Sequence, residues 1–233
     1  MRVQVPPSAL RRRSRDPRPF LFALTSSMKQ IPTILVELAV FASLGDTRNM
    51  RRIARSSRFS SVPPRKITEM CLELHLFAGF PASIEAFITI SPYLRRRKRT
   101  RRKPAARKDQ RETGLKLLHK VHAGNYKKLL QNMESLNSDL ADWIITYGYG
   151  RVLSRRGLSL KERELIAVAS LAALGWRRQL RSHVLGALNA GASIPEMHRI
   201  WKIISHTVPK ALLSRSRSAF FSALQLDNRG EKA

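Results

Sequence analysis

Two side chains in the second half of the sequence have the chemistry of an acid–base pair. Glu164 lies in an apolar stretch, with Val168, Leu171 and Gly175 at i+4, i+7 and i+11, so its helix face is expected to point into packing. A buried carboxylate needs a partner, and the imidazole of His183 on an antiparallel helix could supply one. The alternative is structural: a first-turn acid favoured by the helix dipole and a packed core histidine.

The stretch over residues 159–191 predicts the two helices that would position this pair. Ser159 followed by Glu162 forms a capping box, so the first helix is expected to begin near Leu160. Gly175 lowers helix propensity at the break between the helices. Gly191 supplies the left-handed position that ends the second helix.

Several motifs in this stretch carry a likeness to a known family. They are the KEREL start of the first helix, its small residues, the QLRSH turn and the HVLGALNAG helix. Through them, residues 140–191 resemble the carboxymuconolactone decarboxylase and alkylhydroperoxidase D-like family. The resemblance implies an all-α domain that assembles as trimers or hexamers. It also implies a Glu on one helix facing a His on the next, and these positions hold Glu164 and His183 here.

The hydroperoxidase branch of this family also has a Cys-x-x-Cys pair that ends four residues before the histidine. Those two positions hold Trp176 and Gln179 in this sequence. Because both cysteines are absent, the site cannot perform disulfide redox chemistry. The resemblance therefore points to the cysteine-free, decarboxylase-like branch.

That branch implies a lyase-like enzyme for a small carboxylated lactone or a related carbonyl compound, with no cofactor and no metal. His183 would transfer the proton, and Glu164 would orient the imidazole and set its basicity. For the anionic substrate we expect contacts from Arg181, Arg163, Gln179 and Trp176. Two alternatives remain: a non-catalytic helical oligomer that binds a partner or polyanion through its basic connector, and a hydroperoxidase-like relative that has lost its CxxC.

The charge of the chain is concentrated in segments. The 233 residues carry a formal charge of +28, and eleven of the seventeen residues from Arg95 to Arg111 are Lys or Arg. Such a run is expected to be a flexible connector that makes nonspecific contacts with nucleic acid phosphates. Residues 1–19 are rich in Arg and Pro and predict a disordered tail. This composition also fits a transit peptide, but the prolines oppose an amphipathic helix.

Apolar periodicity before the connector predicts helices over 31–44, 47–56, 66–77 and 82–90. The segment ITEMCLELHLFAGFPASIEAF also resembles the helix–break–helix of the family, so two tandem units are expected. Aligning Gly79 with Gly175 places Thr68 opposite Glu164, and Phe87 opposite His183, so the first unit would be a degenerate scaffold. The expected organisation is a tail over 1–19, a degenerate helical unit over 20–92, a basic connector over 93–111, the family-like unit over 112–226, and a tail over 227–233.

The remaining candidates for chemistry are weaker. Cys71 has no partner cysteine in the chain and is expected to be a buried small hydrophobe. His119 and His122 are three residues apart, but no Asp, Glu or Cys accompanies them at a metal-ligand spacing. Gly148 and Gly150 are expected to stop a helix. No secretory segment or run of eighteen apolar residues is recognised, so we expect no membrane span and a cytoplasmic location.

Overall fold

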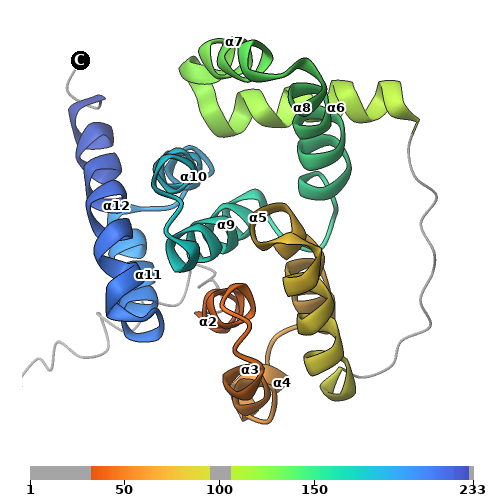
Figure 1. The fold of residues 1–233 in the computed structure, drawn as a ribbon, viewed down its shortest axis with the longest axis vertical. Helices are drawn as coiled ribbons and strands as arrows, with labels where there is room; N and C mark the ends of the chain where they lie inside the picture. Colours follow the sequence, from red (N-terminus) through yellow and green to blue (C-terminus); the bar gives the residue numbers. More distant parts are fainter. Residues whose placement is uncertain (1–32, 95–105, 231–233) are drawn as a thin grey trace, which may run out of the picture. The chain divides into compact units, whose positions relative to one another are not determined.

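The computed structural model describes residues 33–94 and 106–230, and every regular element among them is helical (Figure 1). The all-α prediction is therefore confirmed. The described residues form one compact unit. The predicted N-terminal tail and most of the predicted connector lie outside the described residues. In chain order the elements are α2 (Thr33–Ser43), α3 (Thr47–Ala54), α4 (Ser57–Ser60), α5 (Pro64–Ile90), η1 (Ser91–Tyr93), α6 (Arg107–His122), η2 (Ala123–Asn125), α7 (Tyr126–Leu136), α8 (Ser138–Trp143), η3 (Ile144–Leu153), α9 (Leu160–Leu174), α10 (Arg177–Asn189), α11 (Ile194–Thr207) and α12 (Lys210–Gly230).

Helix α9 is the centre of the core. Every residue from Glu162 to Ala173 is buried, and α9 contacts α2, α5, α10, α11 and α12 (Figure 1). Its many alanines let neighbouring backbones approach closely, which explains how one helix can be covered on all sides. The predicted capping box is confirmed, because the Ser159 hydroxyl accepts from the Glu162 N–H at 3.2 Å and Glu162 Oε2 accepts from the Ser159 N–H at 2.8 Å.

The break between α9 and α10 follows the predicted glycine. Gly175 has φ 74° and ψ 21°, the left-handed conformation that a residue without a Cβ adopts at little cost. Gly191, with φ 91°, follows the end of α10 in the same way. These two turns set the positions of Glu164 and His183 on adjacent helices.

The helices before the connector belong to the same core. Helix α2 is buried along nearly its whole length and packs against α9 and α11 as well as α5. Helix α5 bends at Gly79, where φ 82° and ψ 165° are non-helical, so the two predicted helices around this glycine form one bent element. The two halves of the chain share one core, and the division into tandem units stays a prediction.

The element over Pro64–Tyr93 is long and apolar enough to cross a membrane by length and composition alone. Its first half is instead held by the protein, since Glu69 and Glu73 are buried and form ion pairs with residues at and before α9. Cys71 in the same half is also buried, and burial raises the pKa of its thiol to about 12. The thiol therefore packs as a small hydrophobe, as its sequence context predicts.

The role predicted for Gly148 and Gly150 is wrong. Both lie inside η3, a π-helix that continues to Leu153, instead of stopping a helix. A Cβ on Gly150 would collide with the carbonyl oxygen of Gln110, so this glycine allows η3 and α6 to touch backbone to backbone. Helix α6 begins at Arg107, within the range expected for the connector, and α12 continues to Gly230, within the range expected for the C-terminal tail.

Candidate active site

Glu164 and His183 meet in the structure. His183 Nδ1 lies 2.8 Å from Oε2 of Glu164, and the side chains are 13% and 1% exposed, respectively. Helix α9 supplies the carboxylate and α10 the imidazole, through the turn at Gly175. In the tautomer that carries a proton on Nδ1, the imidazole donates to this carboxylate oxygen. Nε2, the other ring nitrogen, is left without a protein partner among the described residues and is available for proton transfer.

The backbone of α10 leaves room for this carboxylate. Gly186 is one turn after His183, and a Cβ at this position would lie 2.5 Å from Glu164 Oε2 and 2.8 Å from Cγ1 of Val121. Phe77 of α5 contacts the imidazole edge-on, with ring centroids 5.1 Å apart. Four elements, α5, α6, α9 and α10, therefore fix the pair from different sides.

A second polar couple lies beside the pair. His122 at the end of α6 places Nε2 2.7 Å from the hydroxyl of Tyr149 in η3, and both residues are buried. Burial, with a smaller contribution from the charge of His183, lowers the pKa of His122 to about 4. Burial and the nearby charge of Glu164 raise the pKa of Tyr149 well above its usual value. Tyr149 is therefore a neutral donor and His122 a neutral acceptor.

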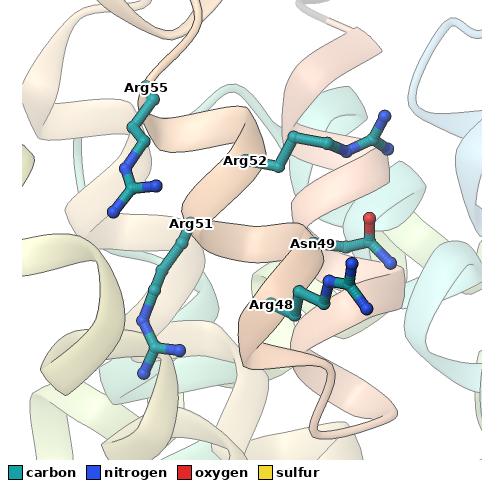
Figure 2. Close-up of a pocket in the computed structure, with 5 residues that line it drawn as sticks. All are labelled: Arg48, Asn49, Arg51, Arg52 and Arg55. Atoms are coloured by element: carbon teal, nitrogen blue, oxygen red, sulfur yellow. The ribbon is translucent and has the colours of Figure 1, made fainter.

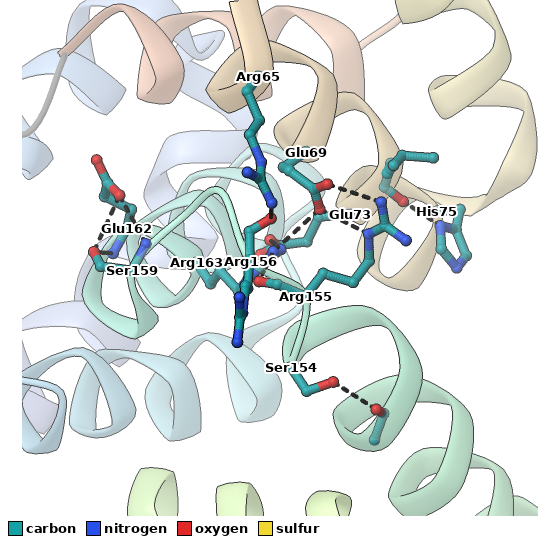
Figure 3. Close-up of polar contacts among 12 residues, drawn as sticks. Arg65, Glu69, Glu73, His75, Ser154, Arg155, Arg156, Ser159, Glu162 and Arg163 are labelled. Atoms are coloured by element: carbon teal, nitrogen blue, oxygen red, sulfur yellow. Dashed lines mark hydrogen bonds and ion pairs between the residues drawn. The ribbon is translucent and has the colours of Figure 1, made fainter. Parts of the chain in front are cut away.

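Arg163, the residue before Glu164 in the sequence, belongs to an ion-pair cluster with Glu69, Glu73 and Arg155 (Figure 3). Arg163 is 1% exposed and donates to Glu73 at 2.6 Å, to Glu69 at 3.2 Å and to the carbonyl oxygen of Arg155 at 2.7 Å. Arg155 makes two further bonds of 2.8 Å to Glu69. The predicted substrate contact of Arg163 is not supported by this placement, because its guanidinium ties α9 to α5.

Glu73 in this cluster is deeply buried. Burial raises the pKa of Glu73 to about 8 against the opposing effect of Arg163, and the charges of Glu164 and Glu69 push it in the same direction as burial. Its Oε1 has no hydrogen-bond partner in the described part of the chain, and the same is true of Oε1 of Glu164. The two carboxyl groups thus influence one another across the core.

The other predicted contacts lie at the exposed start of α10. Trp176, Gln179 and Arg181 are all exposed. Gln179 is four residues before His183 and shares its side of α10, whereas Trp176 is the N-cap residue that precedes the helix. Arg181 is two residues before His183 and lies on a different side.

The sequence did not lead us to the residues of other elements that surround the Glu164–His183 pair. His122 was considered only with His119, which is exposed, whereas His122 continues the buried face of Gly114, Leu118 and Val121. That i, i+4, i+7, i+8 pattern was the available signal. Glu69 and Glu73 gave a similar signal, since they are acids four residues apart in an apolar helix. No cluster of three or more His, Cys, Asp or Glu side chains suited to a metal lies within 33–94 or 106–230.

Comparison with known proteins matches the same part of the chain. The model of the carboxymuconolactone decarboxylase family matches residues 138–219. The chain is 33% identical over 94 residues to 4-carboxymuconolactone decarboxylase of Acinetobacter baylyi, an alignment that covers 40% of this chain and 68% of that protein. It is 35% identical over 86 residues to Peroxisomal protein 2 of Schizosaccharomyces pombe, covering 36% of this chain and 40% of that protein. The chain thus spans less than half the length of the second relative.

Proposed function

We propose, from the premise that this chain belongs to the carboxymuconolactone decarboxylase family, that it catalyses acid–base chemistry on a small carboxylated lactone or related carbonyl compound. The observation that carries the proposal is the 2.8 Å contact between His183 Nδ1 and Glu164 Oε2. A buried carboxylate that orients an imidazole is the arrangement that general acid–base catalysis uses.

Glu164 sets the state of His183 in this proposal. The carboxylate holds the proton on Nδ1, so Nε2 is the nitrogen that faces the reaction. Its negative charge also stabilises the imidazolium that forms when Nε2 takes up a proton. Glu164 acts through His183 and is a positioning residue, whereas His183 is the catalytic residue.

The proposed step is a decarboxylation with protonation at carbon. The bond between the ring carbon and the carboxylate breaks, carbon dioxide leaves, and the electron pair remains on the carbon in conjugation with the lactone carbonyl. The His183 imidazolium then gives its Nε2 proton to carbon and is reprotonated by water. The hydrogen-bonded residues Tyr149 and His122 are both neutral, so they make the surroundings of the pair polar without adding a second charge.

Trp176 and Gln179 support a substrate position at the exposed start of α10. Gln179 is on the same side of α10 as His183, and Trp176 is the exposed N-cap residue of this helix, so a small molecule could contact them on its way to Nε2. We assign no substrate contact to Arg163, which is occupied by Glu69 and Glu73, or to Arg181, which is on another side of α10.

The test is a panel of unsaturated carboxylated lactones and related acids, with carbon dioxide release as the readout. We expect His183→Gln to lower turnover by about 100-fold or more, a typical contribution of a general acid–base group. Glu164→Gln should cost less and shift the pH profile, because the hydrogen bond remains and the charge is lost. His206→Gln, a change of an exposed histidine on α11, is the matched control and should leave turnover unchanged.

Two outcomes would contradict the proposal. Turnover that survives His183→Gln in a folded variant would remove the histidine from the reaction. If the wild-type protein turned over none of the compounds in the panel, the alternative of a non-catalytic binding protein would be favoured. Peroxide reduction with a dithiol as co-substrate is not expected, because Trp176 and Gln179 replace the two cysteines.

A further inference from the structure

Helix α3 presents an arginine stripe that the proposed reaction does not use. Arg48, Arg51, Arg52 and Arg55 follow an i, i+3, i+4, i+7 spacing and are all exposed. With Asn49 they line an open hollow of about 630 Å³ (Figure 2). Figure 2 shows the guanidinium groups fanned out along both sides of the helix instead of converging on one point.

None of the four arginines forms an ion pair with an acid in the described part of the chain. Arg55 donates to the hydroxyl of Tyr93 at 3.2 Å. Arg48 lies near Asp46, but that carboxylate caps α3 and accepts from the backbone and side chain of Asn49. Some exposed basic residues elsewhere do form ion pairs: Arg58 with Glu37, Arg107 and Arg111 both with Asp142, and Lys116 with Glu112.

The opposite face of α3 fixes the stripe to the protein core. Met50, Ile53 and Ala54 are buried, so the helix cannot turn its apolar side outward. A helix that lies in a membrane surface needs that apolar side for insertion among lipid chains. The structure therefore favours a polyanion in water over a lipid surface.

We propose that the Arg48–Arg55 face of α3 binds the phosphate backbone of nucleic acid. Seven residues of helix advance by about 10 Å, a length that accommodates more than one phosphate of an extended strand. A small anion would contact only some of these four arginines. Helix α3 itself carries no aromatic side chain for base stacking, so binding is expected to be independent of sequence and strongly dependent on salt.

The test compares two variants of the full chain that lose the same charge. The first replaces Arg48, Arg51, Arg52 and Arg55 by Gln. The second replaces four exposed basic residues outside α3 and outside the basic run, Arg58, Lys116, Arg199 and Lys210, by Gln. Binding to a short DNA duplex is measured against salt concentration. We expect the first variant to bind at least about tenfold more weakly and to reduce the salt slope by about 3–4, since each phosphate contact contributes about 0.9.

The second variant should bind within about threefold of wild type with nearly the same salt slope. Equal losses in both variants would overturn the proposal, because net charge alone would then explain binding. It would also be overturned if the first variant bound DNA normally, or lost binding only to phosphatidylserine vesicles. Circular dichroism and melting temperature confirm that both variants remain folded, which the exposure of all eight side chains favours.

Discussion

Gly186 lies against the carboxylate of Glu164, and the space of a single missing Cβ is what lets Glu164 reach His183. A Cβ at 186 would lie 2.5 Å from the same oxygen that accepts from the imidazole. The acid–base pair therefore depends on a residue that has no side chain. Helix propensity alone would favour alanine at this position by about 1 kcal/mol.

Gly186→Ala should destabilise the protein despite that propensity. We expect a loss of about 1–3 kcal/mol in the free energy of unfolding, as for other insertions into a packed core. The measurement is urea denaturation, together with turnover on any substrate found. Gly148→Ala is the control, because the nearest atom to its added Cβ is 4.0 Å away. Equal stability of the two variants would show that the carboxylate can move aside freely.

His122 should make the protein sensitive to acid. Its pKa falls from 6.5 when unfolded to about 4 when folded, so the neutral form is favoured by folding. The stabilisation is present above pH 6.5 and is lost as the pH falls through about 4, amounting to about 3 kcal/mol. His122→Gln keeps an acceptor for Tyr149 and should flatten the stability profile between pH 6.5 and 4. If urea denaturation showed that the free energy of unfolding of the variant falls between pH 6.5 and 4 as much as that of the wild type, this role of His122 would be ruled out.

Glu73 should have the opposite effect at alkaline pH. Its folded pKa of about 8 lies above the ordinary value of 4.5, so folding favours the protonated carboxyl. That contribution is complete below pH 4.5 and disappears as the pH rises through 8. Melting temperatures between pH 6 and 9 should therefore fall more for wild type than for Glu73→Gln, in which the amide oxygen still accepts from Arg163. Parallel curves would contradict the raised pKa.

Self-association is expected from the family and from one exposed apolar stripe. Phe80, Ile84 and Ile88 are spaced four residues apart on α5 and are 62%, 54% and 62% exposed. We predict sedimentation of an oligomer at micromolar concentration, and Ile84→Lys should shift it toward monomer. Glu85→Lys, at an exposed neighbouring position, is the control. If the wild-type protein sediments as a monomer, these apolar side chains must be covered by something other than a second copy of the chain.

The parts of this fold that sequence could predict are those with local causes. Ser159 with Glu162 and the left-handed Gly175 are neighbours in the chain, and both act within one helical turn. For the Glu164–His183 pair, the residues alone left a structural alternative open, and the resemblance to the family assigned the facing Glu and His to these positions. Tyr149 and Glu73 were missed because their partners, His122 and Arg163, are far away in sequence and only packing brings them together. Gly150 of η3 was misread for the same reason, because the backbone of α6 that it touches at Gln110 is distant in sequence.

The burial of α2 and α5 against α9 has a consequence for synthesis of the chain. Helix α2 ends at Ser43, but its partner α9 is complete only at Leu174. At about 5–20 residues per second, the interval is on the order of ten seconds. During that time the apolar surface of α2 and the carboxyl groups of Glu69 and Glu73 leave the ribosome without the helix that covers them and without Arg163.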